Sequence, residues 1–186
     1  MGAAKAVRPL SLEEYLALER DASVKHELVE GFPHALAGAS DRHNRVVVNL
    51  VLALVPLARK KGCRLYASDM RLKVDAATVY YPDLMVICMV ICEEDAGEHY
   101  KEKPCLVIEV LSESTEATDR REKLRKYLGL PTLQAYLLVD SRTPPGLRLL
   151  PGGRGLGVPG GGGKASPFLP RGISGPRRGL LRALGP

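Results

Sequence analysis

Residues 104–140 read PCLVIEVLSESTEATDRREKLRKYLGLPTLQAYLLVD, and the fold is predicted most directly from them. Two short apolar runs, PCLVIEVL and TLQAYLLVD, lie on either side of a charged segment with helical spacing. Gly129 and Pro131 are the residues expected to end that helix. A strand, a helix and a second strand in succession favour a right-handed crossover between parallel strands, which predicts an α/β or α+β fold.

The segments upstream complete this pattern. They predict a capped helix from Ser11, a hairpin around Gly31, a helix with Asp41 as its N-cap that ends near Gly62, and strands at 64–74 and 78–92. The order helix, hairpin, helix, three strands, helix, strand favours a central mixed β-sheet flanked by helices. A chain of 186 residues suits one domain with a tail.

Three parts are expected along the chain: an N-terminal arm at 1–10, the domain at 11–140 and a poorly ordered tail at 141–186. The tail is rich in Gly, Pro and Arg and poor in large apolar residues, so it lacks the means to form a core. The motif MVIC occurs at 85–88 and again at 89–92. Because strand side chains alternate with a period of two, four extra residues could lengthen the strand without turning its core face outward.

The net charge of +6 comes from the C-terminal part of the chain. After Asp140 there are eight basic residues and no acidic one, whereas residues 1–140 hold 19 basic and 21 acidic residues, a net charge of −2. A slightly acidic domain binds phosphate through a local patch or a bound cation rather than through its overall field. The global pI is therefore no evidence for DNA binding.

The cysteines and the apolar runs bear on location. Cys63, Cys88, Cys92 and Cys105 lack the close paired spacing of zinc sites, and the N-terminus lacks the apolar run of a signal peptide. No apolar run is long enough to span a membrane. We expect a reduced, cytoplasmic protein without a membrane segment.

Two carboxylates stand in apolar surroundings. Both faces of PCLVIEVL are apolar, so Glu109 has no solvent face, and Asp83 follows Pro82 directly before the apolar run LMVIC. A buried carboxylate is costly unless a cation or a basic partner compensates it. The alternatives are that Glu109 lies at the frayed end of an edge strand and that Asp83 caps its strand from a turn. As a pair on neighbouring strands, they offer the oxygen ligands that Mg²⁺ or Mn²⁺ prefers.

Lys123 lies on the predicted helix, one position from the apolar face of Leu124, Tyr127 and Leu128. Its stem can follow that face and bring the ammonium to an interior edge. The alternative is a surface pair with Asp119, four residues earlier on the helix.

Five segments occur in a fixed order: HELVEG, SDRHNRVVVNL, PD at 82–83, IEVLSEST with Glu109, and DRREKLRKY with Lys123. Together they resemble the bacterial putative restriction endonuclease family, a domain of unknown function within the PD-(D/E)XK nuclease superfamily, and the resemblance covers residues 11–140. It implies a restriction-endonuclease-like core, Asp83 and Glu109 as metal ligands, and a lysine that orients or activates the attacking water. The usual motif has that lysine two residues after the glutamate; Leu111 stands there, so Lys123 is the candidate for a lysine relocated to the helix.

Two upstream residues match positions that often approach the site in this family. Glu27 in HELVEG could complete the metal sphere and His43 in SDRHNRV could contact phosphate; a structural glutamate and a helix-surface histidine are the alternatives. The implied reaction is hydrolysis of DNA phosphodiester bonds by an endonuclease, in which Mg²⁺ or Mn²⁺ polarises the phosphoryl oxygen and acidifies the attacking water. A homodimer would suit the cutting of two strands.

Two other hypotheses stand beside the enzyme. The first is a binding or interaction protein that has the nuclease fold but no catalytic activity. Leu111, the MVIC repeat and the net charge of −2 favour it. A decayed or frameshifted gene is favoured by the tail, because relatives usually continue with structured sequence where this chain turns to Gly, Pro and Arg.

Overall fold

The computed structural model describes residues 8–88, 99–112, 116–142 and 146–151. Helices and strands follow one another in the expected order, with extra short strands. They are α1 (Leu12–Asp21), β1 (His26–Val29), β2 (Phe32–Ala35), α2 (Asp41–Lys60), β3 (Cys63–Ala67), β4 (Arg71–Asp75), β5 (Thr78–Tyr80), β6 (Leu84–Cys88), β7 (Tyr100–Lys101), β8 (Leu106–Leu111), α3 (Glu116–Thr118), the π-helical turn η1 (Asp119–Lys123), α4 (Leu124–Leu128), β9 (Ala135–Asp140) and β10 (Gly146–Pro151).

The strands form two five-stranded sheets, where the sequence favoured a single central one. The first has the order β2-β1-β5-β4-β7 and the second the order β10-β9-β8-β6-β3. Both are mixed, because β4 pairs parallel with β7 and β8 parallel with β9. The crossover through residues 116–128 therefore joins a parallel pair, and the α+β class with a mixed sheet between helices is confirmed.

Turns inside the two expected strand segments explain the second sheet. The segment 64–74 breaks at Ser68, whose φ is 31°, so β3 joins the second sheet and β4 the first. The segment 78–92 breaks at Pro82, which lies between β5 in the first sheet and β6 in the second. Proline provides no backbone N–H for a strand ladder, so a break there is favoured.

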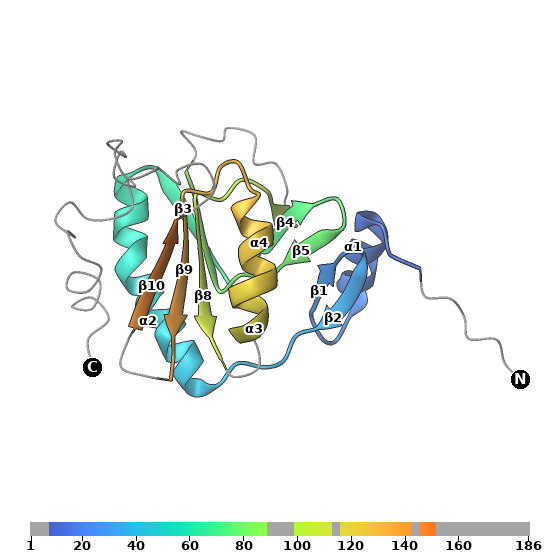
Figure 1. The fold of residues 1–186 in the computed structure, drawn as a ribbon, viewed down its shortest axis with the longest axis horizontal. Coiled ribbons are helices and arrows are strands. Elements are labelled where there is room, and N and C mark those ends of the chain that lie inside the picture. The colour runs from blue at the N-terminus through green and yellow to red at the C-terminus, as the bar shows by residue number, and fades with distance from the viewer. Residues whose placement is uncertain (1–7, 89–98, 113–115, 143–145, 152–186) are drawn as a thin grey trace, which may run out of the picture.

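The second sheet is covered on both faces (Figure 1). One face packs against α2 and the other against the helical segment α3–η1–α4. The alternation of side chains along β8 divides its residues between these layers. Ile108 and Val110 belong to the cluster that includes Leu50 and Leu54 of α2, and Val107 and Leu111 to the cluster that includes Tyr127. Glu109 therefore faces the α3–η1–α4 side.

A smaller cluster of Tyr15, Leu28 and Val79 joins α1 to the first sheet. The predicted capping box of α1 is present, with Ser11 accepting a bond from the backbone of Glu14 and the Glu14 side chain returning one. The predicted hairpin is also present. Its turn uses Glu30 and Gly31, both with positive φ, and a Cβ at Gly31 would collide with Pro9.

Two details concern the ends of elements. The N-cap of α2 is Ser40 rather than Asp41, because the Ser40 hydroxyl accepts the N–H of His43. Within the expected tail, β10 pairs antiparallel with β9, so ordered backbone continues beyond residue 140 to Pro151. Its sequence, GLRLLP, contains three leucines, unlike the Gly- and Pro-rich sequence that follows it. Residues 152–186 and the second MVIC lie outside the described residues.

The cysteines also differ from the expectation of a fully reduced chain. Cys63 and Cys88 stand opposite each other in the antiparallel pair of β3 and β6 and are joined as a disulfide. They are 25 residues apart in sequence, so only the register of the sheet brings them together. Cys105 is buried and takes no part in this disulfide, and Cys92 lies outside the described residues. Across the described segments, no helix combines the length and apolar character needed to cross a bilayer.

Candidate functional site

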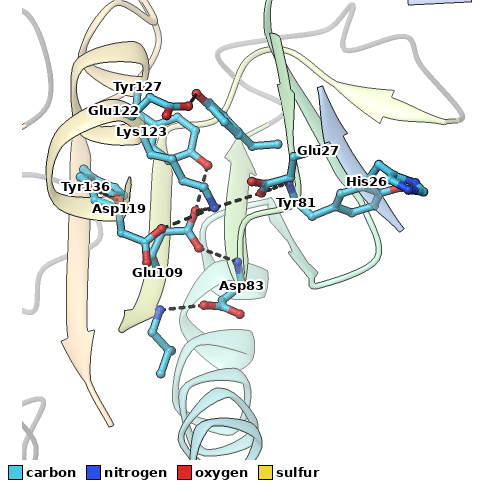
Figure 2. A network of polar contacts seen from close by, with 12 residues as sticks. His26, Glu27, Tyr81, Asp83, Glu109, Asp119, Glu122, Lys123, Tyr127 and Tyr136 are labelled. Atoms are coloured by element: carbon cyan, nitrogen blue, oxygen red, sulfur yellow. Dashed lines mark hydrogen bonds and ion pairs between the residues drawn. The ribbon is translucent and has the colours of Figure 1, made fainter. Parts of the chain in front are cut away.

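The two carboxylates predicted as metal ligands lie side by side where β6 and β8 meet. The antiparallel ladder between these strands ends at the pair Leu84 and Ile108, so Asp83 and Glu109 are next in register. The backbone N–H of Asp83 donates to Glu109 Oε2 at 3.2 Å, and the N–H of Val110 donates to Asp83 Oδ2 at 2.7 Å. These bonds fix both carboxylates at the end of the ladder (Figure 2).

Glu109 is buried inside the second sheet, with its side chain 3% exposed. Because β8 lies between β6 and β9, the alternative of a frayed edge strand does not apply. Glu109 Oε1 accepts bonds from the Tyr127 hydroxyl at 2.9 Å and the Lys123 ammonium at 3.2 Å. Burial raises the pKa of Glu109 well above its ordinary value; Lys123 opposes this rise, and three neighbouring carboxylates add to it.

Lys123 lies in the π-helical turn η1, and its ammonium points into a group of acidic side chains (Figure 2). Its Nζ is 3.0 Å from Glu27 Oε1, 3.2 Å from Glu109 Oε1 and 3.5 Å from Asp119 Oδ1. The pair with Asp119 exists, but it is buried rather than on the surface, since the Lys123 side chain is 7% exposed. Burial alone would lower the pKa of Lys123, but the carboxylates outweigh burial and raise it, so the ammonium stays charged.

Glu27 reaches the same place from β1 of the first sheet. Its Oε1 accepts the backbone N–H of Tyr81 at 3.1 Å and contacts Lys123 at 3.0 Å. Glu27 is 7% exposed. The Glu27 carboxylate therefore holds the backbone at Tyr81, two residues before Asp83. Through its contact with Lys123 it also links the first sheet to the helical segment that covers the second sheet.

His43 lies in the first turn of α2 and contacts Asp83. Its Nε2 is 3.3 Å from Asp83 Oδ2, and its side chain is 13% exposed, so it is not a helix-surface residue. The hydrogen bond with Asp83 raises the pKa of His43, and burial opposes that rise. Its Nδ1 is buried and makes no hydrogen bond among the described residues.

All five residues singled out from the sequence thus lie in one cluster, and the structure adds two more. Asp119 was interpreted as a surface partner and Tyr127 as an apolar helix residue, yet both are buried beside Glu109. The spacing of Asp119, Lys123 and Tyr127, four residues apart each time, could have indicated that they share one helix face.

All of these side chains except Tyr127 line a cleft of about 1020 Å³, whose lining also includes Lys25, Arg42 and Arg142. Within the cluster, carboxylates outnumber the Lys123 ammonium, and carboxylate oxygens are the donors that Mg²⁺ and Mn²⁺ prefer. No three or more His, Cys, Asp or Glu side chains of the described segments are grouped to hold a metal ion. Asp83 and Glu109 are nevertheless adjacent, and two neighbouring carboxylates fit a cation whose octahedron is completed by water.

The chain matches the Uma2 family model, described as "Putative restriction endonuclease", over residues 12–153. Two uncharacterized proteins of Synechocystis sp. are similar to it. The protein sll1609 is 36% identical over 132 residues, which cover 70% of this chain and 75% of that protein. The protein slr1290 is 38% identical over 133 residues, which cover 71% and 69%.

The fold is similar to the crystal structure of a putative nuclease belonging to DUF820 from Anabaena variabilis. The TM-score is 0.59, and the match covers 77% of this chain and 85% of that chain at 16% sequence identity. At that identity the likeness concerns the fold, which is nuclease-like.

Proposed function

The chain belongs to the Uma2 family of putative restriction endonucleases, and we propose that it is a metal-dependent endonuclease that hydrolyses phosphodiester bonds of DNA. One observation carries the proposal. Asp83 and Glu109 are fixed side by side at the wall of an open cleft, with the Lys123 ammonium 3.2 Å from Glu109. Paired acidic oxygens with a charged ammonium beside them are the groups that metal-assisted phosphodiester hydrolysis requires.

Each side chain has a separate task in this reaction. Asp83 and Glu109 would hold Mg²⁺ or Mn²⁺ through their carboxylates. When bound, the cation supplies Lewis-acid polarisation of a phosphoryl oxygen and acidifies a water molecule. Lys123 remains charged in its acidic surroundings and offsets negative charge that develops on the phosphate. His43 orients the Asp83 carboxylate through the 3.3 Å contact of its Nε2.

DNA reaches this acidic site through local positive charge. Residues 1–140 have a net charge of −2, so long-range attraction by the domain is weak. Lys25, Arg42 and Arg142 lie in the lining of the cleft, where they can contact phosphates on either side of the bond to be cut. A homodimer with one site for each strand, and a cytoplasmic location, belong to the same proposal.

A second candidate is a nuclease-fold protein that binds without catalysis. It is favoured by Leu111, which is 1% exposed in an apolar cluster where the usual motif has its lysine. The position of Lys123 argues for the enzyme instead, because its ammonium reaches Glu109 from the helix. Metal binding and cleavage separate the two candidates.

The experiment is a titration of the full chain with Mn²⁺ by calorimetry, followed by nicking of supercoiled plasmid in Mg²⁺. We expect binding and nicking by the wild type, and loss of both in Asp83→Asn and in Glu109→Gln. Glu116→Gln is the matched control, because this carboxylate pairs with Arg120 and Arg142 rather than with the cluster. Absence of Mn²⁺ binding at about millimolar concentration would exclude the metal-dependent enzyme. Linear plasmid formed together with a dimer in sedimentation would support paired sites.

A further inference from the structure

The helix that carries Lys123 contains one wide turn, and that turn begins and ends at two buried charged residues. η1 covers Asp119–Lys123, between the short helices α3 and α4. π-helical turns are rare and occur often at functional sites, because the wider turn changes which side chains face inward. Here Asp119 is 2% and Lys123 6% exposed, although both are charged.

A hydrogen bond from the second sheet holds this turn in place. The hydroxyl of Tyr136, on β9, donates to the backbone carbonyl of Asp119 at 3.0 Å, and this bond is buried. The Asp119 side chain is 3% exposed, and its Oδ1 is 3.5 Å from Lys123 Nζ. Burying a carboxylate this deeply is costly unless a cation compensates it. The Lys123 ammonium is such a cation, and it contacts Asp119 directly.

Asp119 differs from the other two carboxylates that contact Lys123. Glu109 Oε1 is shared between Lys123 and Tyr127, and Glu109 is one of the two proposed metal ligands. Glu27 also accepts the backbone N–H of Tyr81. Asp119 lies on the same helical segment as Lys123, four residues earlier, so it moves with the lysine as one unit.

We propose that Asp119 is a positioning residue, which holds the Lys123 ammonium in place when Glu109 shares its charge with a bound cation. This inference rests on the proposed function for the role of Lys123. The restraint itself is the 3.5 Å contact between Asp119 Oδ1 and Lys123 Nζ, and it can be measured apart from any activity.

The first test observes the ammonium group directly. A lysine ammonium held by lasting hydrogen bonds gives its own ¹H–¹⁵N signal, because its protons exchange slowly with water. We expect such a signal in the wild-type protein, assigned to Lys123 by its loss in Lys123→Met. Asp119→Asn should broaden or remove the signal. Glu116→Gln, a carboxylate of the same helical segment that pairs with arginines, should leave it unchanged.

The second test measures cleavage and metal binding in the same variants. Asp119→Asn should lower kcat about 10- to 100-fold, because a misplaced ammonium no longer meets the phosphate correctly. Its Kd for Mn²⁺ should change by only about threefold, because Asp119 is not one of the two proposed ligands and only its charge beside Glu109 is removed. In a Lys123→Met background, Asp119→Asn should cause no further loss, because its effect passes through Lys123.

The following results would contradict or support the positioning role of Asp119. An unchanged ammonium signal in Asp119→Asn, or a loss of Mn²⁺ binding as severe as in Asp83→Asn, would overturn the positioning role. Should Asp119→Asn fail to fold, Asp119→Glu takes its place: a retained signal supports the proposal and a lost one contradicts it. If the wild type neither binds Mn²⁺ nor nicks plasmid, the proposed function fails, while the ammonium spectra still decide on Asp119.

Discussion

Asp83 and Glu109 are bound to each other across two strands, the N–H of Asp83 donating to the Glu109 carboxylate at 3.2 Å. The Asp83 carboxylate in turn accepts the N–H of Val110, the residue after Glu109, at 2.7 Å. Side chains thus continue the β6–β8 pairing beyond its last backbone pair. The carboxylates proposed to bind a cation therefore also connect strands β6 and β8. Mutations can distinguish the effect on metal binding from the effect on stability.

Substitutions at Asp83 make this separation. Asp83→Ala leaves the buried N–H of Val110 without its acceptor, and we expect it to lower the free energy of unfolding by about 1–3 kcal/mol. Asp83→Asn keeps an acceptor oxygen and should cost less. Both should lose Mn²⁺ binding, because neither retains the charged ligand. Urea denaturation and calorimetry measure the two effects. Equal stability of the two variants would contradict the structural task.

Leu111 occupies the place of the lysine in the usual motif, and its environment is apolar. It is 1% exposed and belongs to the cluster of Tyr127, Leu138 and Tyr136. Leu111→Lys should lower the free energy of unfolding by more than about 2 kcal/mol, since an ammonium would be buried without a partner. Leu111→Met is the control and should cost less than about 1.5 kcal/mol. A Leu111→Lys variant as stable as wild type, and active without Lys123, would contradict a relocated lysine.

The sequence predicted which side chains lie close together better than it predicted the arrangement of the sheets. Glu109 could be predicted because both faces of its strand are apolar, so burial of its carboxylate followed from alternation alone. Lys123 could be placed near it because the helix directly follows β8. The two sheets could not be predicted, because no local pattern shows that the strands before and after Ser68, and before and after Pro82, join different sheets. The π-helical turn depends on contacts with Tyr136 and the carboxylates, which no local pattern encodes.

Other features could not be predicted from the sequence because they depend on contacts between segments that are far apart along the chain. Glu27 meets the backbone of Tyr81, 54 residues later, and the disulfide joins strands whose register the sequence does not reveal. The role of Asp119 was hidden for a different reason. A pair of opposite charges four residues apart on a helix is ordinarily solvent-exposed, and only the packing of η1 against β9 buries this one.

A second polar cluster controls the acid stability of the fold. Glu19, whose side chain is 1% exposed, accepts bonds from the Tyr81 hydroxyl at 2.9 Å and the backbone N–H of His26 at 3.1 Å. Burial tends to raise the pKa of Glu19, but the bonds from His26 and Tyr81 and the charge of Arg71 lower it below its ordinary value of 4.5. A carboxylate with a lowered folded pKa contributes stability above its unfolded pKa, and this contribution is lost as pH falls through the folded value.

Glu19→Gln tests this cluster. At neutral pH the variant should be less stable than the wild type, and the difference should shrink as pH falls below 4.5. Urea denaturation of both proteins at several pH values measures it. Glu13→Gln, on the same helix but exposed, is the control and should show no such dependence. A stability difference that is constant from neutral to acidic pH would show that ionisation of Glu19 is not involved.

Lys123 gives the prediction that best separates metal binding from catalysis. Its ammonium neutralises part of the charge on Glu109, Glu27 and Asp119, so it competes with any cation for the same oxygens. Lys123→Met removes that positive charge while keeping a long apolar stem. We expect the Kd for Mn²⁺ to fall by roughly threefold or more, because one repulsive charge a few ångströms away is removed. The rate of plasmid nicking should nevertheless fall about 100-fold or more, because no ammonium remains to offset charge on the phosphate. Lys126→Met, which removes a lysine of the same helical segment that pairs with Asp75 instead, is the control and should change neither property. Weaker Mn²⁺ binding in Lys123→Met would mean that the lysine supports the ligands rather than competing with the cation, and unchanged nicking would remove Lys123 from the reaction.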